Sequence, residues 1–145
     1  MSITRQDPNT VFLGGDRTQV NDLAVSEALT PGMLVERFNN AGVIRWRKAT
    51  TDVAGPPAVI TEQSMLNLGV DNAYAANDLA EVSILHKGGT AWMFIASGQD
   101  ITAGTLLGSA GDGSLKSGAT VARFTALENK TAANTGLTRI RVEAL

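Results

Sequence analysis

The chain has 145 residues and a mass of 15.1 kDa, a length that fits one domain. It contains no cysteine, which excludes disulfides, thiolate metal sites and cysteine nucleophiles. Its 12 Lys and Arg against 14 Asp and Glu give a formal net charge of -2, whereas nucleic-acid-binding proteins usually carry a strong basic excess. We therefore expect no nucleic-acid partner.

The N-terminal 22 residues have few apolar side chains apart from Ile3 and the group Val11–Leu13. Such a segment cannot bury a core of its own. It is either a frayed end, as many termini are, or a docking segment. The isolated apolar group between flexible flanks favours docking. The sequence therefore predicts an extended N-terminal arm over residues 1–22 and a folded domain over residues 23–145.

Dense Gly and Asn punctuation between short runs of Val, Ile, Thr and aromatic residues is typical of an all-β fold. Residues 33–38 and 43–49 alternate in polarity around the turn-forming Asn39–Gly42, which predicts a hairpin. In its second strand Ile44 and Trp46 share one face, as a period of two requires. A proline-containing loop then leads to a short strand over residues 58–61 and one or two helical turns over residues 62–68, closed by Gly69.

A second hairpin is predicted from residues 80–86 and 90–97, with Gly88 and Gly89 supplying the turn. Its return strand is apolar on both faces, whereas an open antiparallel sheet has one wet face. Two explanations remain open for this strand: interior packing within a small barrel, or an interface between subunits.

The last third of the chain predicts short strands over residues 101–107 and 109–116, around a turn at Asp112 and Gly113. Two longer strands follow, over residues 120–127 and 139–144. The second of these ends almost at the C-terminus, so we expect that end of the chain to lie within a sheet.

Few residues suggest catalytic or metal chemistry. His86 is the only histidine, so neither a metal site nor a catalytic triad can be completed around it. Asp71 and Asp78 lack the spacing of a calcium loop, and the glycine clusters contain no phosphate-binding motif. We expect a protein that is not an enzyme and uses neither cofactor nor metal.

The low fraction of charged residues bears on what the surface contacts. Only 18% of the residues are charged, against roughly 25% in an ordinary soluble domain. Such a surface either faces other protein or belongs to a neutral monomer. The longest apolar stretch, residues 91–96, is far shorter than the ~18 residues of a membrane helix, so we expect no membrane partner. The first ten residues show no secretory pattern.

Several short segments resemble the capsid decoration proteins of tailed bacteriophages, which are also called cement or head-stabilisation proteins. The resemblance covers roughly residues 28–145. Where many relatives have Gly-Asp before the central hairpin, this chain has Asn77 and Asp78, and Asn tolerates the same left-handed geometry. The segments that carry the resemblance are Leu29–Glu36, Asp71–Val82, Ile101–Leu107, Asp112–Leu115 and Arg141–Leu145.

The resemblance implies a small β-barrel or β-tulip domain, similar to a β-clip. It also implies a structural virion protein, made in the host cytoplasm, that binds the outer surface of the expanded capsid. There it would cement neighbouring subunits of the major capsid protein and stabilise the head. Such proteins form homo-oligomers, more often trimers than dimers. The alternatives are a tail or baseplate component and a binding module or enzyme of β-clip type.

Two sets of site residues follow from this interpretation. The arm offers apolar side chains and extended backbone to a sheet edge of the major capsid protein. Its predicted capsid-binding residues are Ile3, Arg5, Asp7, Pro8, Val11, Phe12 and Leu13. The predicted oligomer interface is the doubly apolar strand, with Trp92, Met93, Phe94 and Ile95.

Overall fold

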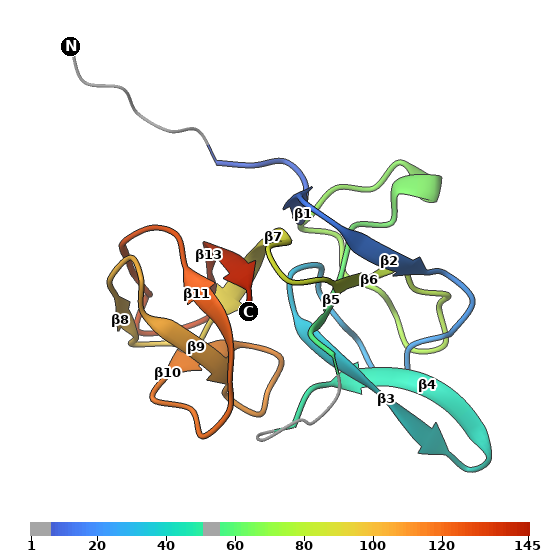
Figure 1. The fold of residues 1–145 in the computed structure, drawn as a ribbon. Helices are drawn as coiled ribbons and strands as arrows, with labels where there is room; N and C mark the ends of the chain where they lie inside the picture. The colour runs from blue at the N-terminus through green and yellow to red at the C-terminus, as the bar shows by residue number, and fades with distance from the viewer. Residues whose placement is uncertain (1–6, 51–55) are drawn as a thin grey trace.

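The computed structural model describes residues 7–50 and 56–145, and these residues form an all-β fold with one short 3-10 turn, η1 (Ser64–Leu66). The strands fall into two lobes, which lie left and right in Figure 1. The predicted all-β class and small β-barrel are confirmed. The strands are β1 (Phe12–Gly14), β2 (Arg17–Val20), β3 (Leu34–Asn40), β4 (Val43–Lys48), β5 (Ala58–Ile60), β6 (Val82–Leu85), β7 (Thr90–Ile95), β8 (Asp100–Ile101), β9 (Leu106–Ser109), β10 (Leu115–Ser117), β11 (Ala122–Ala126), β12 (Lys130–Thr131) and β13 (Thr138–Ala144).

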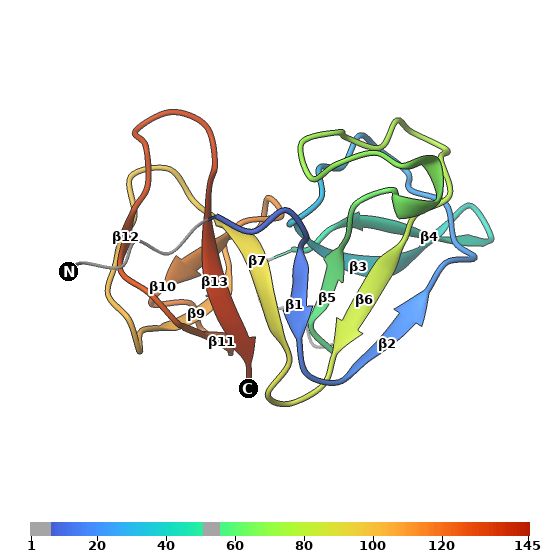
Figure 2. The ribbon, with the colours of Figure 1, turned by 90° about the horizontal axis from the view of Figure 1, so that it is seen from above.

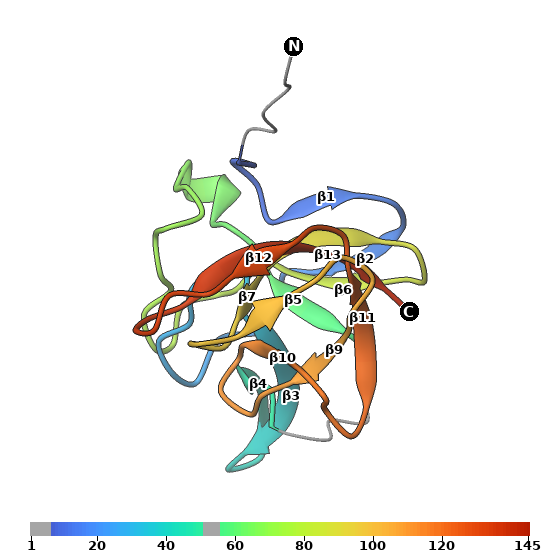
Figure 3. The ribbon, with the colours of Figure 1, turned by 90° about the vertical axis from the view of Figure 1, so that its left-hand side faces the viewer.

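The first lobe is a closed barrel in the order β7-β10-β9-β11-β13, with a β13–β7 pairing that completes the ring (Figure 3). All five of these strands lie in the C-terminal part of the chain, after residue 89. The predicted strands over residues 120–127 and 139–144 correspond to β11 and β13. The predicted strand over residues 101–107 overlaps β9 at residues 106–107, and the one over residues 109–116 overlaps β10 only at residues 115–116. The short ribbon of β8 and β12 extends one end of the barrel.

The second lobe is an open antiparallel sheet in the order β2-β6-β5-β3-β4. The predicted β3–β4 hairpin is confirmed, and its register pairs Asn40 with Val43. Ala41 and Gly42 form the two-residue turn, and both have positive φ, which gives the twist that hairpins favour. The Asn39 side chain accepts a hydrogen bond from the Gly42 N–H at 2.7 Å. Ile44 and Trp46 lie on one face, as the sequence predicts.

The inner part of this sheet, formed by β5, β6 and the start of β3, is buried on both faces because its side chains alternate between two cores. Leu34, Val59 and Leu85 pack with the barrel interior, which includes Met93 and Phe124. The opposite face packs in a second core between the sheet and the segments that cover it. Its members are Val25, Leu29, Met33, Val35, Trp46, Ala58, Ile60, Tyr74, Ala80, Val82 and Phe94.

Two chain segments cross together from one lobe to the other. β1 pairs with β7 in the barrel, and β2, which follows it, pairs with β6 in the sheet. The two crossings meet at Gly15 and Gly89, where a Cβ on Gly15 would lie 2.8 Å from the Cα of Gly89. Both crossings lie at the lower edge of Figure 2. Glycine is therefore required by the close approach of two backbones.

The hairpin predicted from residues 80–86 and 90–97 is wrong. β6 and β7 belong to different sheets, so the turn at residues 86–89, closed by the Gly89 N–H on the His86 carbonyl at 2.8 Å, leads from one lobe to the other and does not pair the two strands. The crossing also explains why β7 is apolar on both faces. Met93 and Ile95 are fully buried in the barrel core, whereas Phe94 packs in the second core. Interior packing therefore accounts for both faces of β7.

The N-terminal segment is largely part of the fold. Val11 is fully buried in the barrel core, and β1 and β2 pair with strands of the same chain. The arm that the sequence predicts over residues 1–22 is therefore held in the domain from Val11 to Val20. Pairing with β7 and β6 offsets the ordering entropy that a free segment cannot recover.

One turn differs in detail from the expectation. The predicted helical turns over residues 62–68 shrink to η1, and Asn67 closes it with φ 55. Gly69 was expected to supply that left-handed cap. Asn adopts left-handed geometry more readily than other residues with a side chain, so it replaces glycine here.

The fully buried Trp46 anchors the second core, with 1% of its surface exposed. We expect Trp46→Ala to lower the free energy of unfolding by ~3–5 kcal/mol, because the cavity cannot collapse fully. Urea unfolding followed by circular dichroism measures the loss. Ile44→Ala is the matched control on the same face, where 45% exposure limits the loss to below ~1 kcal/mol. Equal losses at the two positions would contradict the assigned burial.

Gly108 is the tightest backbone contact in the barrel wall. A Cβ there would lie 2.2 Å from the carbonyl oxygen of Val121, so Gly108→Ala must displace β9 from β11. We expect a loss of roughly 1–3 kcal/mol in unfolding free energy. Gly69→Ala is the control, since its nearest neighbouring atom lies 3.8 Å away, and thermal melts of both variants test the difference.

Candidate binding surfaces

Chemically reactive side chains are not clustered in the described residues. No group of three or more His, Asp or Glu that could hold a metal ion occurs among residues 7–50 and 56–145. His86 is exposed, and its Nε2 lies 2.8 Å from Thr18 Oγ1. Among the same residues there is no helix with the length and apolar character that crossing a membrane takes. The remaining candidates for a functional site are surfaces that could bind a partner.

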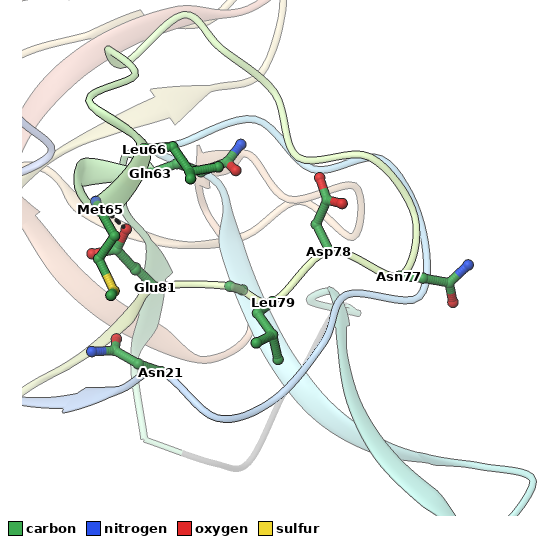
Figure 4. Close-up of a pocket in the computed structure, with 9 residues that line it drawn as sticks. Asn21, Gln63, Met65, Leu66, Asn77, Asp78, Leu79 and Glu81 are labelled. Atoms are coloured by element: carbon green, nitrogen blue, oxygen red, sulfur yellow. Dashed lines mark hydrogen bonds between the residues drawn. The ribbon is translucent and has the colours of Figure 1, made fainter.

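The first surface is a hollow of about 430 Å³ on the second lobe (Figure 4). Its walls come from three segments: the residue after β2, the η1 turn and the stretch before β6. We call it the acidic hollow. Its apolar residues are Met65, Leu66 and Leu79, and its polar residues include Gln63, Asp78 and Glu81.

Hydrogen bonds hold the walls of the acidic hollow in place. Glu81 accepts a hydrogen bond from Ser64 Oγ at 2.6 Å and another from the Met65 N–H at 3.3 Å. The Glu81 carboxylate therefore joins the η1 turn to the start of β6, which follows Glu81 directly. Asp78 accepts the Ala75 N–H at 2.9 Å and closes the preceding turn. The shape of the hollow is thus set before any partner binds.

The buried hydroxyl of Tyr74 joins Thr61 to Glu81, which lines the hollow. This hydroxyl donates to the carbonyl of Thr61 at 2.8 Å and accepts the Glu81 N–H at 3.1 Å. Burial disfavours the phenolate and raises the pKa of Tyr74 well above its usual range. The hydroxyl therefore stays protonated and bonded to both segments at neutral pH.

The second surface is the outer part of the β3–β4 hairpin, residues 37–48, which we call the basic hairpin. It projects beyond the rest of the sheet in Figures 1 and 3. Val43 and Ile44 at its tip are 53% and 45% exposed. Its cations are Arg37, Arg45, Arg47 and Lys48, four of the 12 Lys and Arg in the chain.

Arg139 joins the two lobes. From β13 it stacks on the rings of Trp92 and Phe94, with its Cζ 4.9 and 4.5 Å from their centres. Its guanidinium donates to the carbonyls of Val70 at 2.6 Å and Pro31 at 3.1 Å. The planar fork therefore fixes two segments of the second lobe against the barrel wall.

The residues predicted to bind a capsid are divided between the interior and the surface. The side chain of Val11 is buried, and Phe12 and Leu13, both in β1, are half-buried. Asp7 is exposed and Pro8 is half-buried. Ile3 and Arg5 lie outside the described residues.

The predicted oligomer interface lies inside a single copy. Met93, Phe94 and Ile95 are buried, and Trp92 is half-buried beneath Arg139. The exposed apolar residues instead include those of the acidic hollow and the basic hairpin. One signal in the sequence could have indicated them: the chain has no Lys or Arg between Lys48 and Lys87, directly after the cationic group of the hairpin.

Comparison with known proteins finds similarity at the level of the fold. No protein-family model matches the chain, and a search of curated proteins finds no match either. The fold is similar to that in the crystal structure of the head fiber gp8.5 N base in bacteriophage phi29, with a TM-score of 0.61. The match covers 90% of this chain and 95% of that chain, at 13% sequence identity. At this identity the similarity shows a shared fold.

Arg139 gives a test of how the lobes are joined. We expect Arg139→Ala to lower the free energy of unfolding by about 2 kcal/mol, because two part-buried carbonyls lose a charged donor. Arg139→Lys should recover only part of this, since an ammonium cannot reproduce the planar fork. Asp71→Asn is the control: the Asp71 side chain is 86% exposed, so its ion pair contributes less than ~1 kcal/mol. Urea unfolding followed by circular dichroism compares the three variants.

Proposed function

We propose that this protein is a structural component of a tailed-bacteriophage head, which binds the outer surface of the capsid and cements neighbouring subunits of the major capsid protein. The observation that carries the proposal is the shared fold with the N base of a phage head fiber, over nearly the whole length of both chains. One fold can serve many functions, so features of this chain's own surface must support the role.

The surface suits binding better than catalysis. The acidic hollow is shaped by hydrogen bonds within the chain, and its rim is apolar. Both carboxylates that line it, Asp78 and Glu81, already accept hydrogen bonds from neighbouring segments of the same chain. Exposed apolar patches of this kind mark protein contacts. These features support a non-enzymatic, structural role.

The segment before β1 is the part that we assign to capsid contact. The Val11 N–H donates to Glu62 Oε2 at 3.0 Å, and the Val11 side chain is buried, so this residue fixes where the preceding segment meets the domain. Asp7, Asn9 and Thr10 are exposed. The capsid-binding arm is therefore residues 1–10, shorter than the arm that the sequence predicts.

Binding by such an arm would cement a shell through linkage. Ordering its backbone costs on the order of 1–2 kcal/mol per residue, so contacts with capsid subunits must offset that cost. If those contacts span two subunits, they form only in the assembled head. Binding then stabilises the assembled shell over separated subunits by mass action.

The test is direct binding to undecorated expanded capsids, followed by reconstruction of the complex. We expect density for the domain on the outer surface. Deleting residues 2–9 should weaken binding at least tenfold, about 1.4 kcal/mol, and leave the melting temperature unchanged because the deletion stops short of Val11. A capsid that binds none of the full-length protein would refute the proposed function.

The matched control replaces residues 2–9 with a Gly-Ser segment of equal length. Weakened binding by this variant would show that the side chains of the arm carry the affinity. If the deleted and replaced variants both bind with full affinity, the capsid contact lies on the β-domain and the assignment of the arm is refuted.

A further inference from the structure

One edge of the open sheet has no neighbouring segment beside it. β2 and β4 are the outer strands of this sheet, and Figure 2 shows β2 at the rim of the second lobe. The edge of β4 is covered, because Trp46 donates its N–H to the Ala24 carbonyl and accepts the Ser26 N–H, both at 3.0 Å. Among the described residues no segment covers β2 in this way, and three of its four residues are exposed.

The register of β2 shows which backbone groups face this free edge. His86 donates its N–H to the carbonyl of Asp16 at 3.1 Å, so these two residues form a hydrogen-bonded pair next to β2. Such pairs alternate along antiparallel strands, so the N–H and C=O of Thr18 also point toward β6. The N–H and C=O groups of Arg17 and Gln19 point away from β6. Within the part of the chain that the structure describes, these outward groups have no hydrogen-bond partner.

β2 lacks three features that commonly protect a free strand edge: a proline, a β-bulge and a charged side chain that projects past the strand. Its pairing with β6 runs from Arg17 to Val20 without a shift in register, so this ladder contains no bulge. Its one charged side chain is directed inward, because Arg17 lies over the Phe12 ring at 4.2 Å and donates to Ser83 Oγ on β6 at 2.9 Å. The edge of β2 can therefore accept a further strand.

We infer that an extended segment of a capsid subunit pairs with β2 and continues the open sheet. Outward N–H and C=O groups at strand spacing recognise an extended backbone, which is the chemistry of β-strand addition. The inference rests on the proposed function, which assigns residues 1–10 to capsid contact. Only β1 and a turn separate that arm from β2, so a subunit held by the arm lies close to the edge. Pairing with β6 already orders β2, so the edge loses little conformational freedom on binding.

The side chains of β2 leave the backbone as the main source of affinity. Thr18 and Gln19 are polar and exposed, and Thr18 Oγ1 lies 2.8 Å from His86 Nε2. Val20, the one apolar residue of the strand, is half-buried. A partner therefore gains more from hydrogen bonds to the edge than from side-chain contacts with it. The decisive test removes a backbone group of β2 and compares the result with removal of the side chain alone.

Gln19→Pro is that variant, because it removes one outward N–H and places a ring on the edge while the hydrogen bonds to β6 remain. We expect it to weaken binding to undecorated expanded capsids at least tenfold, with a melting temperature close to that of the wild-type protein. Gln19→Ala is the matched control: it removes the same side chain, keeps the N–H and should bind with wild-type affinity. Thr18→Pro removes an N–H that points toward β6, so it should lower the melting temperature instead.

Hydrogen exchange of the wild-type protein gives a second readout, which decides the matter if Gln19→Pro does not fold. The outward amides of Arg17 and Gln19 should exchange rapidly in the free protein and slowly on capsids.

Three results would overturn the inference. Full capsid affinity of Gln19→Pro, or unchanged exchange of the two amides on capsids that bind the protein, would do so and leave the proposed function intact. Protection of these amides in concentrated free protein would assign the edge to a second copy. Capsids that bind no wild-type protein would refute the inference and the proposed function together.

Discussion

The close approach of two backbones at Gly15 and Gly89 determines how the chain is divided between the barrel and the open sheet. At this corner the segment from β1 to β2 and the segment from β6 to β7 leave one lobe and enter the other together. A side chain at either position would separate the two crossings and break the pairing of β1 with β7. The N-terminal residues are consequently part of the barrel wall, and the central strands belong to different sheets.

Two cores within 145 residues account for the weakly charged composition. The inner strands of the open sheet bury both faces, and β7 buries one face in the barrel and the other against Arg139 and the second core. Internal burial therefore accounts for the low charge. Most of the apolar side chains that stay exposed on the second lobe lie on the acidic hollow and the basic hairpin, so these two surfaces are the candidates for contact with another protein.

Local patterns in the sequence predicted where strands lie better than they predicted which strands pair. The β3–β4 hairpin was predicted because alternation and turn residues act over a few positions, and the strands of the barrel were located for the same reason. The pairing of β6 with β2 was missed because Gly88 and Gly89 serve a turn and a crossing equally well. Arg139 and the acidic hollow were missed because their partners lie far away in the sequence.

The position of β13 also sets an order on folding during synthesis. This strand closes the barrel against β7 and β11, so the ring cannot form until residue 144 has left the ribosome. The second lobe is complete once β6 is made, yet Leu34, Val59 and Leu85 then lack the core that covers them. The nascent chain must therefore carry an uncovered apolar sheet face through the synthesis of the last third of the protein. Exposure of this kind is the stage at which aggregation competes with folding and at which a chaperone has a surface to bind.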